Sequence, residues 1–481
     1  MTITRAATEF DPALRKTSLV VALGAIMTVL DTTIVNVAVT VLGRDLHSSL
    51  ATIQWVITGY TLALSMTIPI TGWAVERFGA KTMWITSLVL FVGGSVLCGM
   101  AWSAGSLIAF RLVQGVGGGL LMPIGQTMLA RAAGPARMGR AMAVIAIPAM
   151  LAPALGPVLG GLLLDHLAWR WMFYVNVPVC AAALLLAARL LPPDGERATA
   201  GRLDTLGLAL LSPGLAALVY GLAQAGEGAG PGDARVVWGV AGGLALLAAF
   251  VVHSLRSGDR ALVNVRLFAD RAFGTSAGAL LFYSVGMFGM LILVPLYDQV
   301  VRGGGTLDAG LLVAPLGVGA ILTMPVAGRV TDRYGPKAPG IAGIACVLAG
   351  TFAFTLAGAS TSLPFLAAAL FVVGLGHGLI VPSLTAGAYS GLLPAAIPSA
   401  TTAATIVIRV ASALGSAVLA IVLQILIRSG VPGSGGTLAG AAGHPGALAD
   451  AFAGSFRWAF ALLALCLIPA LFVPRRPAVT P

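Results

Sequence analysis

Residues 20–41 constrain the fold more than any other part of the sequence, because they form a long apolar run that contains one carboxylate. A bilayer core about 30 Å thick needs about 20 apolar residues in a helix. Asp31 lies inside the run, about 20 Å along a helix that starts after Lys16. A charge at that depth costs several kcal/mol unless it is paired, solvated or protonated. The run therefore predicts a membrane helix with a functional carboxylate.

The composition indicates that the rest of the chain is also embedded in a membrane. Of the 481 residues, 58% are hydrophobic and only 9% are charged, which no soluble domain matches. The formal net charge of +11 does not indicate nucleic-acid binding, because the basic residues fall between apolar runs and form no continuous face. The four cysteines lie inside apolar runs, so we expect neither a metal site nor a disulfide framework.

Apolar runs of spanning length recur along the whole chain. Fourteen are predicted, at approximately residues 17–42, 52–74, 82–102, 105–131, 139–164, 170–190, 204–224, 235–255, 272–298, 308–330, 338–358, 363–391, 398–427 and 453–474. We therefore predict an all-α integral membrane protein with fourteen transmembrane helices.

The distribution of basic residues predicts the orientation of the chain. With the N-terminus inside, the loops and termini on that side hold twenty of the 28 Lys and Arg residues, and the opposite side holds six. Loops on the cytoplasmic side are enriched in Lys and Arg. We therefore expect a multi-pass protein of the plasma (inner) membrane with both termini in the cytoplasm.

Two segments recur in the same order in both halves of the chain. The segment GWAVERFGAKTMW at 72–84 recurs as GRVTDRYGPKAPG at 328–340, which is 256 residues later. The segment GVGGGLLMP at 115–123 recurs as GLGHGLIVP at 374–382, which is 259 residues later. Repeats in the same order, on the same predicted side, indicate two halves related by an axis along the membrane normal.

The repeats predict the domain organisation. We expect a six-helix bundle at residues 1–195, two inserted helices with their linkers at 196–262, and a second six-helix bundle at 263–481. Because the two inserted helices carry no charge within the membrane, we expect them at a peripheral, lipid-facing position.

Both copies of the first repeat fit the pattern G-x-x-x-[DE]-R-x-G-x-K. This pattern resembles the signature loop between the second and third helices of the major facilitator superfamily. In that family the acidic residue helps to hold the cytoplasmic gate closed. The first copy departs from the family pattern at Glu76 and Ala80, and the second at Pro336. The resemblance implies gating roles for Glu76, Arg77, Gly79, Lys81, Asp332 and Arg333.

Arg111 opens a segment, Arg-Leu-Val-Gln-Gly-Val-Gly, that resembles the R-x-x-Q-G-x-G motif of the same superfamily. Arg111 lies about 9 Å inside the outer edge of its predicted span, and Asp31 lies at a similar depth. An interaction between them, direct or through water, is therefore allowed and would tune proton binding by the carboxylate. A static pair that only fixes packing is the alternative. The repeat places Leu370 at the position of Arg111 in the second half, so the charges are expected to act in the first half.

The fifth predicted span is rich in proline and small residues. Its segment ALGPVLGG resembles the antiporter motif G-x-x-x-G-P-x-x-G-G, which the superfamily associates with export. Prolines bend a helix, and small residues let a neighbouring helix approach. An ordinary packing face is the alternative, but it does not explain the Gly-Pro and Gly-Gly pairs together. The resemblance implies a hinge made of Pro153, Gly156, Pro157, Gly160 and Gly161.

The segments DTTIVNVA at 31–38, WRWMFYVNVP at 169–178 and PLYDQVVRGGG at 295–305 resemble the fourteen-span drug:proton antiporters. The resemblance implies export of amphipathic drug-like compounds in exchange for protons, by alternating access, with Asp31 and Arg111 coupling the proton. No ATP-binding P-loop is found, so an ion gradient is the expected energy source. We expect no cofactor and no enzymatic activity. The expected partners are the small-molecule substrate, protons and the bilayer, and we expect a monomer.

Polar and aromatic residues within the predicted spans are candidates for the substrate cavity. They are Asn36, Gln54, Trp55, Tyr60, Gln126, Tyr283, Asp298, His377 and Arg409. An Arg at mid-depth must face the protein interior or a water-filled cavity, so Arg409 can hold an anionic group or pair with a carboxylate. We expect Asp298 at a solvated helix end and His377 as a hydrogen-bonded core residue. Because Arg409 and Asp298 suit a charged ligand, a dedicated exporter of one endogenous metabolite, antibiotic or lipid remains the competing prediction.

Overall fold

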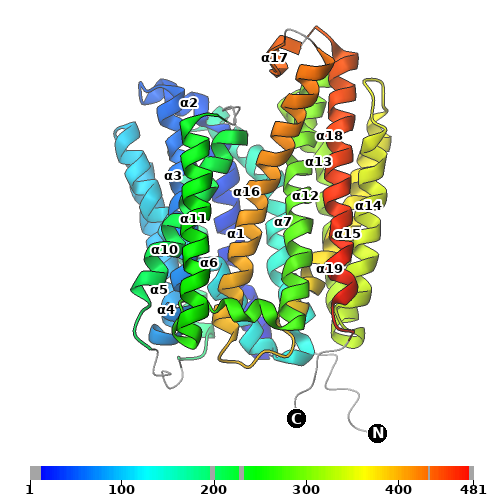
Figure 1. The fold of residues 1–481 in the computed structure, drawn as a ribbon. Coiled ribbons are helices and arrows are strands. Elements are labelled where there is room, and N and C mark those ends of the chain that lie inside the picture. The colour runs from blue at the N-terminus through cyan, green and yellow to red at the C-terminus, as the bar shows by residue number, and fades with distance from the viewer. Residues whose placement is uncertain (1–11, 195–200, 227–231, 432–433, 442, 476–481) are drawn as a thin grey trace.

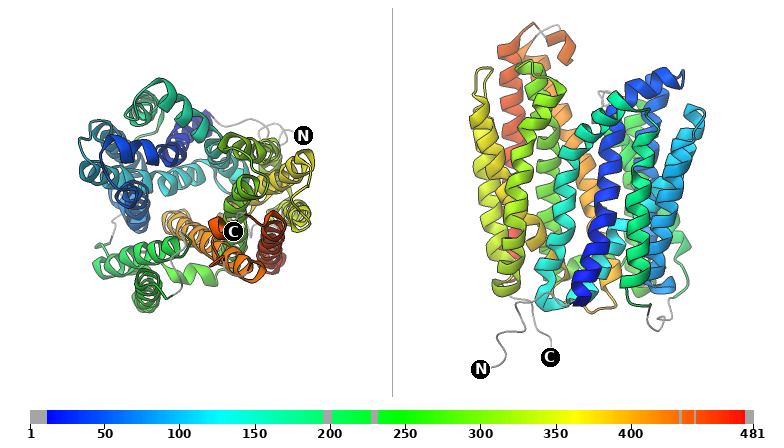
Figure 2. Two further views of the ribbon diagram at one scale, coloured as in Figure 1. Left: turned by 90° about the horizontal axis from the view of Figure 1, so that it is seen from above. Right: turned by 180° about the vertical axis from the view of Figure 1, so that it is seen from behind.

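The computed structural model describes residues 12–194, 201–226, 232–431, 434–441 and 443–475, with only the backbone of residues 135, 147–155, 157–158, 165, 259, 306–307 and 439. The described residues form long helices joined by short turns, with no strand among them (Figure 1). The start of the first helix, α1 (Pro12–Val37), and the end of the last, α19 (Leu467–Phe472), lie at the same end of the molecule, as the view from behind also shows (Figure 2). We call this the terminal end and the opposite one the distal end.

The order of elements follows the predicted spans. The first six spans comprise α1 (Pro12–Val37), α2 (Val39–Asp45), α3 (Leu50–Thr67), η1 (Ile68–Ile70), α4 (Thr71–Phe78), α5 (Ala80–Gly99), α6 (Ala104–Ala133), η2 (Pro135–Arg137), α7 (Met138–His166), α8 (Trp171–Tyr174) and α9 (Asn176–Leu190). The inserted segment holds α10 (Thr205–Gly226), α11 (Ala234–Ser257), η3 (Gly258–Arg260) and η4 (Val265–Ala269). The last six spans comprise α12 (Arg271–Val301), α13 (Thr306–Tyr334), α14 (Lys337–Thr355), α15 (Leu363–Tyr389), α16 (Ile397–Gly430), α17 (Leu438–Ala441), α18 (Pro445–Leu465) and α19 (Leu467–Phe472).

The helices confirm the predicted all-α membrane fold. Among the described residues, 13 helical segments are long and apolar enough to cross a membrane. The helix α7 has 29 residues and occupies the place of the fifth predicted span. Each predicted span therefore coincides with a helix, and the chain is a multi-pass membrane protein.

The repeated loop has the same backbone in both halves. Gly79 separates α4 from α5 with a φ of 92°, and Gly335 separates α13 from α14 with a φ of 87°. Only glycine adopts such angles without steric cost. Two residues later, Lys81 and Lys337 donate hydrogen bonds to carbonyl oxygens at the C-terminal ends of α9 and α19. The sequence repeat is thus also a structural repeat.

Two large clusters of buried apolar side chains stabilise the helices. One is drawn mainly from α1–α9 and includes Trp84 and Phe91, and the other is drawn from α12–α19 and includes Phe354 and Phe456. Burying a large apolar side chain contributes about 1.5–3 kcal/mol. The boundaries of the three predicted domains stay a prediction.

The two groups of helices contact each other at the terminal end. The helix α7 packs against α13 and α15, and α16 packs against α4 and α6. The hydroxyls of Thr127 and Thr401 lie 2.8 Å apart, and Tyr389 Oη donates to Gln126 Oε1 at 3.0 Å. These side chains belong to the terminal halves of their helices.

The two inserted helices differ in their surroundings. Only 22% of the most apolar window of α11 is buried, so α11 fits the predicted lipid-facing position. The helix α10 instead contacts both α3 and α16. Ser212 Oγ donates to Met66 O at 2.6 Å, and the rings of Trp55 and Tyr220 stack at 5.9 Å. On its other side, α10 packs against Ala417 of α16, so the expectation of a peripheral pair is wrong for α10.

Candidate functional site

Asp31 of α1 is buried and held by three N–H donors. Arg111 Nη1 of α6 lies 2.6 Å from Asp31 Oδ2, and both side chains are at most 1% exposed. Gln114 Nε2 and Asn176 Nδ2 donate to Asp31 Oδ1 at 2.8 and 2.9 Å. A carboxylate that only accepts hydrogen bonds fits this arrangement in its ionised form. The pair with Arg111 is direct, one of the two arrangements that the depth argument allowed.

Arg111 has other acceptors besides Asp31. Its Nε donates to Val56 O at 3.2 Å, and its Nη1 also donates to Gln114 Oε1 at 2.8 Å. The guanidinium carbon lies 4.0 Å from the centre of the Tyr60 ring, within the range of a cation–π interaction. Arg111 therefore has three partners besides the carboxylate: Val56 O, Gln114 Oε1 and the Tyr60 ring.

The amide partners of Asp31 are residues that the sequence analysis did not assign to the site. Gln114 stands one helical turn after Arg111, in the same motif, so helical spacing could have found it. Asn176 lies within a segment that was recognised only as a family resemblance. Its Nδ2 also donates to Ser95 Oγ at 3.0 Å, and Ser95 in turn donates to Phe173 O at 2.8 Å. No sequence signal indicates that α5 and α9 meet α1 here.

Asp332 forms an ion pair between the two groups of helices. Its Oδ2 lies 2.8 Å from Arg140 Nε of α7, and its Oδ1 accepts the Gly139 amide at 2.8 Å. The backbones approach so closely here that a Cβ added at Gly328 would lie 2.9 Å from the Cα of Arg140. Asp332 was a predicted gating residue, whereas its partner Arg140 was not.

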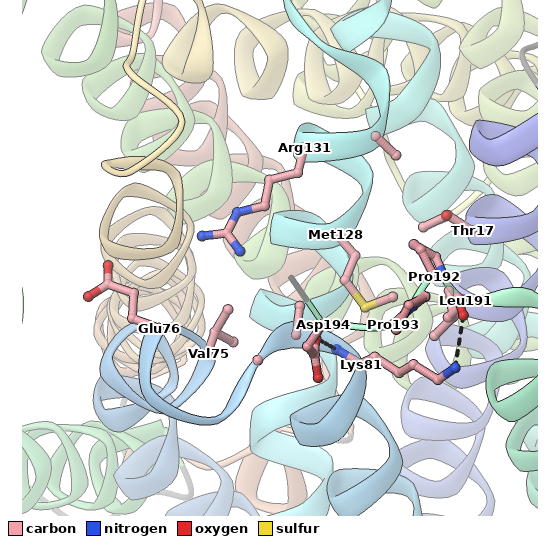
Figure 3. Close-up of a pocket in the computed structure, with 13 residues that line it drawn as sticks. Thr17, Val75, Glu76, Lys81, Met128, Arg131, Leu191, Pro192, Pro193 and Asp194 are labelled. Atoms are coloured by element: carbon pink, nitrogen blue, oxygen red, sulfur yellow. Dashed lines mark hydrogen bonds between the residues drawn. The ribbon is translucent and has the colours of Figure 1, made fainter. Parts of the chain in front are cut away.

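Glu76, the repeat counterpart of Asp332, is arranged differently. Within the described part of the chain, no basic side chain lies within 4 Å of it, and it faces Arg131 across a pocket at the terminal end (Figure 3). The pocket has a volume of about 420 Å³ and is also lined by Lys81 and Asp194. Of the other predicted gating residues, Arg77 and Arg333 are exposed.

Asp194, which the sequence analysis missed, caps the N-terminus of α5. It accepts the amides of Lys81 and Thr82 at 2.8 and 3.0 Å and the Thr82 hydroxyl at 2.7 Å. Lys81 Nζ donates to Leu191 O at 2.8 Å, three residues before Asp194. These bonds tie the loop after Gly79 to the end of α9.

The predicted hinge residues lie on α7 opposite α1. A Cβ added at Gly156 would overlap Thr33, and one added at Gly160 would lie 3.2 Å from Ile34 O. A Cβ added at Gly161 would have no neighbour within 4 Å among the described residues. The side chains of Pro153 and Pro157 lie outside the described residues.

The expectation of a solvated helix end at Asp298 is wrong. Asp298 is 2% exposed and lies 3.3 Å from Arg302 Nε, one turn later in the chain. The chain folds back after α12, since the Gly304 amide donates to Asp298 O at 3.0 Å and covers the helix end. The carboxylate is therefore paired and shielded from solvent.

The other cavity candidates fall into several environments. His377 is buried and hydrogen-bonded to Tyr283, as expected for a core residue. Asn36 and Trp55 are exposed, and Gln54 is partly exposed. Tyr60 is buried, while Gln126 and Arg409 are partly exposed.

Comparison with known proteins identifies the family. Residues 21–419 match the family model described as Major Facilitator Superfamily. The chain is 41% identical over 388 residues to the multidrug resistance protein B homolog of Mycobacterium tuberculosis, covering 80% of this chain and 72% of that one. It is 33% identical to the multidrug export protein EmrB of Haemophilus influenzae, covering 67% and 64%.

A solved structure agrees at the level of the fold. The proton:xylose symporter XylE superposes with a TM-score of 0.62 at 16% identity, covering 96% of both chains. The matched family, the helical fold and the membrane spans agree with one another. The chain therefore belongs to the major facilitator superfamily of membrane transporters.

Proposed function

We propose that this protein is a secondary transporter of the plasma membrane that exports amphipathic drug-like compounds in exchange for protons. The relatives named for multidrug resistance or export support the direction and kind of substrate. The observation that carries the proton exchange is the Asp31 network, in which a carboxylate lies inside the membrane span and its arginine partner has further acceptors. Ionisable residues at such depth commonly form proton pathways.

In this mechanism, Asp31 binds the proton that enters from outside. Two opposite charges 4 Å apart attract each other by about 4 kcal/mol at an effective dielectric constant of 20. Protonation of Asp31 removes this attraction, yet Arg111 keeps Val56 O, Gln114 Oε1 and the Tyr60 ring as partners. The network can therefore change its charge state without leaving an unpaired guanidinium.

The proposed orientation gives the helix contacts a functional meaning. We infer that both termini are cytoplasmic, which would make the terminal end the cytoplasmic end. The Asp332–Arg140 pair and the contact between Thr127 and Thr401 then keep the substrate path closed to the cytoplasm. Loading of a compound requires these contacts to separate as the two groups of helices rock around the midplane.

The close packing of α7 on α1 would transmit this motion to the proton site. Gly156 lies against Thr33, two residues after Asp31. A shift of α7 along α1 therefore displaces the helix that carries the carboxylate. This supports a role for Gly156 and Gly160 as the hinge between gate and proton site.

Proton release in inside-out vesicles tests the proposal. A pH-sensitive dye reports the proton gradient while lipophilic drugs are added to vesicles with wild-type protein, Asp31→Asn or Asp45→Asn. Asp45 is a partly exposed carboxylate near the distal end and serves as the matched control. We expect substrate-triggered proton efflux in wild type and Asp45→Asn, and its loss in Asp31→Asn. Efflux that persists in a correctly inserted Asp31→Asn protein would contradict the coupling role.

A further inference from the structure

Among the described residues of the membrane interior, Arg409 is a charge without a counter-charge. Asp31 and Asp298 are each paired with an arginine. Arg409, near the middle of α16, has neither a carboxylate within 4 Å nor a hydrogen-bond partner for its guanidinium in the described part of the chain. An arginine at this depth is costly unless it faces water or an anion.

Arg409 belongs to a polar stripe on α16. Thr401, Thr405, Arg409, Ser412 and Ser416 follow one another at intervals of three or four residues, so they share one face of the helix. Thr401 is fully buried and Thr405 is 8% exposed, whereas the other three are partly exposed. The stripe is therefore closed at the terminal end and becomes accessible from Arg409 toward the distal end.

The stripe faces the first six spans. Thr401 contacts Thr127 of α6, and Arg409 lies on the same face of α16 as Thr401. The neighbouring faces of α16 are covered, since Ala417 packs against α10 and Gly415 lies against the backbone of α12 at Val285. Arg409 is thus directed at the space between the two groups of helices and away from lipid.

Tyr60 of α3 carries a second donor without a described acceptor. Its hydroxyl is buried and has no hydrogen-bond partner among the described residues. The face of its ring contacts Arg111, 4.0 Å from the ring centre. The partly exposed guanidinium of Arg409 likewise lacks a negatively charged oxygen atom as a partner within the described part of the chain.

We propose that Arg409 binds an anionic group of the exported compound, so that the preferred substrates are amphipathic anions that carry a carboxylate, sulfonate or phosphate. Guanidinium–carboxylate and guanidinium–phosphate hydrogen bonds are strong and often bidentate. The hydroxyls of the polar stripe would solvate the anion. This inference rests on the proposed export function.

Uptake of two related dyes into inside-out vesicles tests the inference. Fluorescein and rhodamine 123 share a xanthene ring system, but the first is an anion and the second a cation at neutral pH. We expect wild-type protein to prefer fluorescein. Arg409→Gln should lower fluorescein uptake about tenfold without lowering uptake of rhodamine 123. Arg409→Lys, which keeps the positive charge, should retain part of the fluorescein uptake. Arg428→Gln, an exposed position on the same helix, is the matched control.

Each other outcome has a definite meaning. Unchanged fluorescein uptake in Arg409→Gln, or an equal fall for both dyes, would overturn the anion site and leave the export function intact. Wild-type export of rhodamine 123 without fluorescein would also overturn it. Uptake of neither dye by the wild-type protein, or proton-coupled uptake that survives Asp31→Asn, would contradict the proposed function itself.

Discussion

At the scale of single residues, the central feature is that Asp31 depends on two amide side chains as much as on its arginine. Gln114 both donates to Asp31 and accepts from Arg111, so it fixes the relative position of the two charges. Asn176 fixes the same carboxylate from α9. The two amides fix the position of the carboxylate, whereas an ion pair without them could adopt several geometries.

Replacement of Gln114 tests this dependence. Gln114→Leu removes the side chain that donates to Asp31 and accepts a hydrogen bond from Arg111. Each buried polar group left without a partner costs about 1–3 kcal/mol. We expect a lower unfolding temperature in detergent and impaired substrate-triggered proton release. Thr40→Ala, at an exposed position nine residues after Asp31, is the control and should change neither. Equal effects of the two variants would contradict the structural role of Gln114.

The guanidinium of Arg111 should not be replaceable by an ammonium. Arg111 reaches Asp31, Gln114 and Val56 at once through a planar fork, which Lys cannot reproduce. We expect Arg111→Lys to insert normally and to lower proton-coupled transport about tenfold or more. Transport rates in vesicles, normalised to the amount of inserted protein, provide the measurement. Full activity of this variant would indicate that charge alone suffices.

Depth arguments predicted two members of this site, but not their neighbours. The apolar run around Asp31 and the position of Arg111 determine that each charge needs a partner, and their similar depths bring them together. Which helices surround them depends on tertiary packing, and the sequence carries no local signal for it. Hence the amides from α6 and α9 were absent from the prediction, and Asp298 was expected to be solvated.

At the scale of helices, the packing of α7 against α1 is the feature most sensitive to substitution. Gly156→Ala should force Thr33 to shift, because the added Cβ would overlap it, and overpacking costs about 1–3 kcal/mol. We expect reduced stability and slower transport. Gly161→Ala, five residues away with open space around it, should be neutral or slightly stabilising. The test compares the unfolding temperatures and the transport rates of the two variants. A larger loss in Gly161→Ala than in Gly156→Ala would contradict this account.

The inserted helices are anchored at the terminal end by Asp204. Its carboxylate accepts the amides of Gly207 and Leu262 at 2.8 and 3.0 Å and lies 2.8 Å from His253 Nε2. Burial tends to raise the pKa of Asp204, but the hydrogen bonds from both amides and from His253 outweigh it, and the pKa lies below its ordinary value. The ionised carboxylate therefore stabilises the start of α10 and the segment after α11.

The lowered pKa predicts how this anchor responds to pH. A carboxyl whose pKa is lower in the folded state adds stability above its unfolded pKa of about 3.9, and this stability is lost as the pH falls through the folded value. The rate of hydrogen exchange at the Leu262 amide, compared between wild type and Asp204→Asn, measures how much the ionised carboxylate stabilises this segment. We expect faster exchange in the variant at about pH 6, and a difference that shrinks steadily as the pH falls below about 4. If the ratio of the two exchange rates did not change with pH, the ionised form of Asp204 would not be the stabilising one.

The positions of the helices were largely predictable, whereas the environment of α10 was not. Apolar length alone identified each span, since a helix must satisfy its backbone polar groups inside the membrane. The absence of charge in α10 suggested contact with lipid. Its apolar residues instead pack against α16, and an uncharged sequence fits both surroundings equally well.

At the scale of the whole molecule, the contacts at the terminal end determine which side of the substrate path is closed. Asp332→Asn should weaken the pair with Arg140 while leaving the Gly139 amide an acceptor. Hydrogen bonds to charged groups are worth about 1.5–3 kcal/mol, so we expect roughly a tenfold shift toward the state with this end open. Distances between spin labels on α7 and α13 measure the shift. Arg329→Gln, an exposed position three residues before Asp332 on α13, should leave these distances unchanged, and a similar shift in both variants would argue against the latch.

The sequence predicted the membrane fold, the repeat and the family, because each depends on patterns that extend over many residues. It did not predict the conformational state, because a transporter sequence must be compatible with more than one. The unequal latch is an example: the repeat makes Glu76 and Asp332 equivalent in sequence, but only Asp332 has a basic partner within 4 Å among the described residues.

The most direct test of the central claim is net transport against a substrate gradient in proteoliposomes. Wild type and Asp31→Asn are compared for accumulation driven by an imposed proton gradient and for downhill exchange without one. If Asp31 carries the exchanged proton, the variant should still equilibrate substrate downhill but fail to accumulate it. Accumulation by Asp31→Asn to the wild-type level would contradict the claim and place the coupled proton on another group.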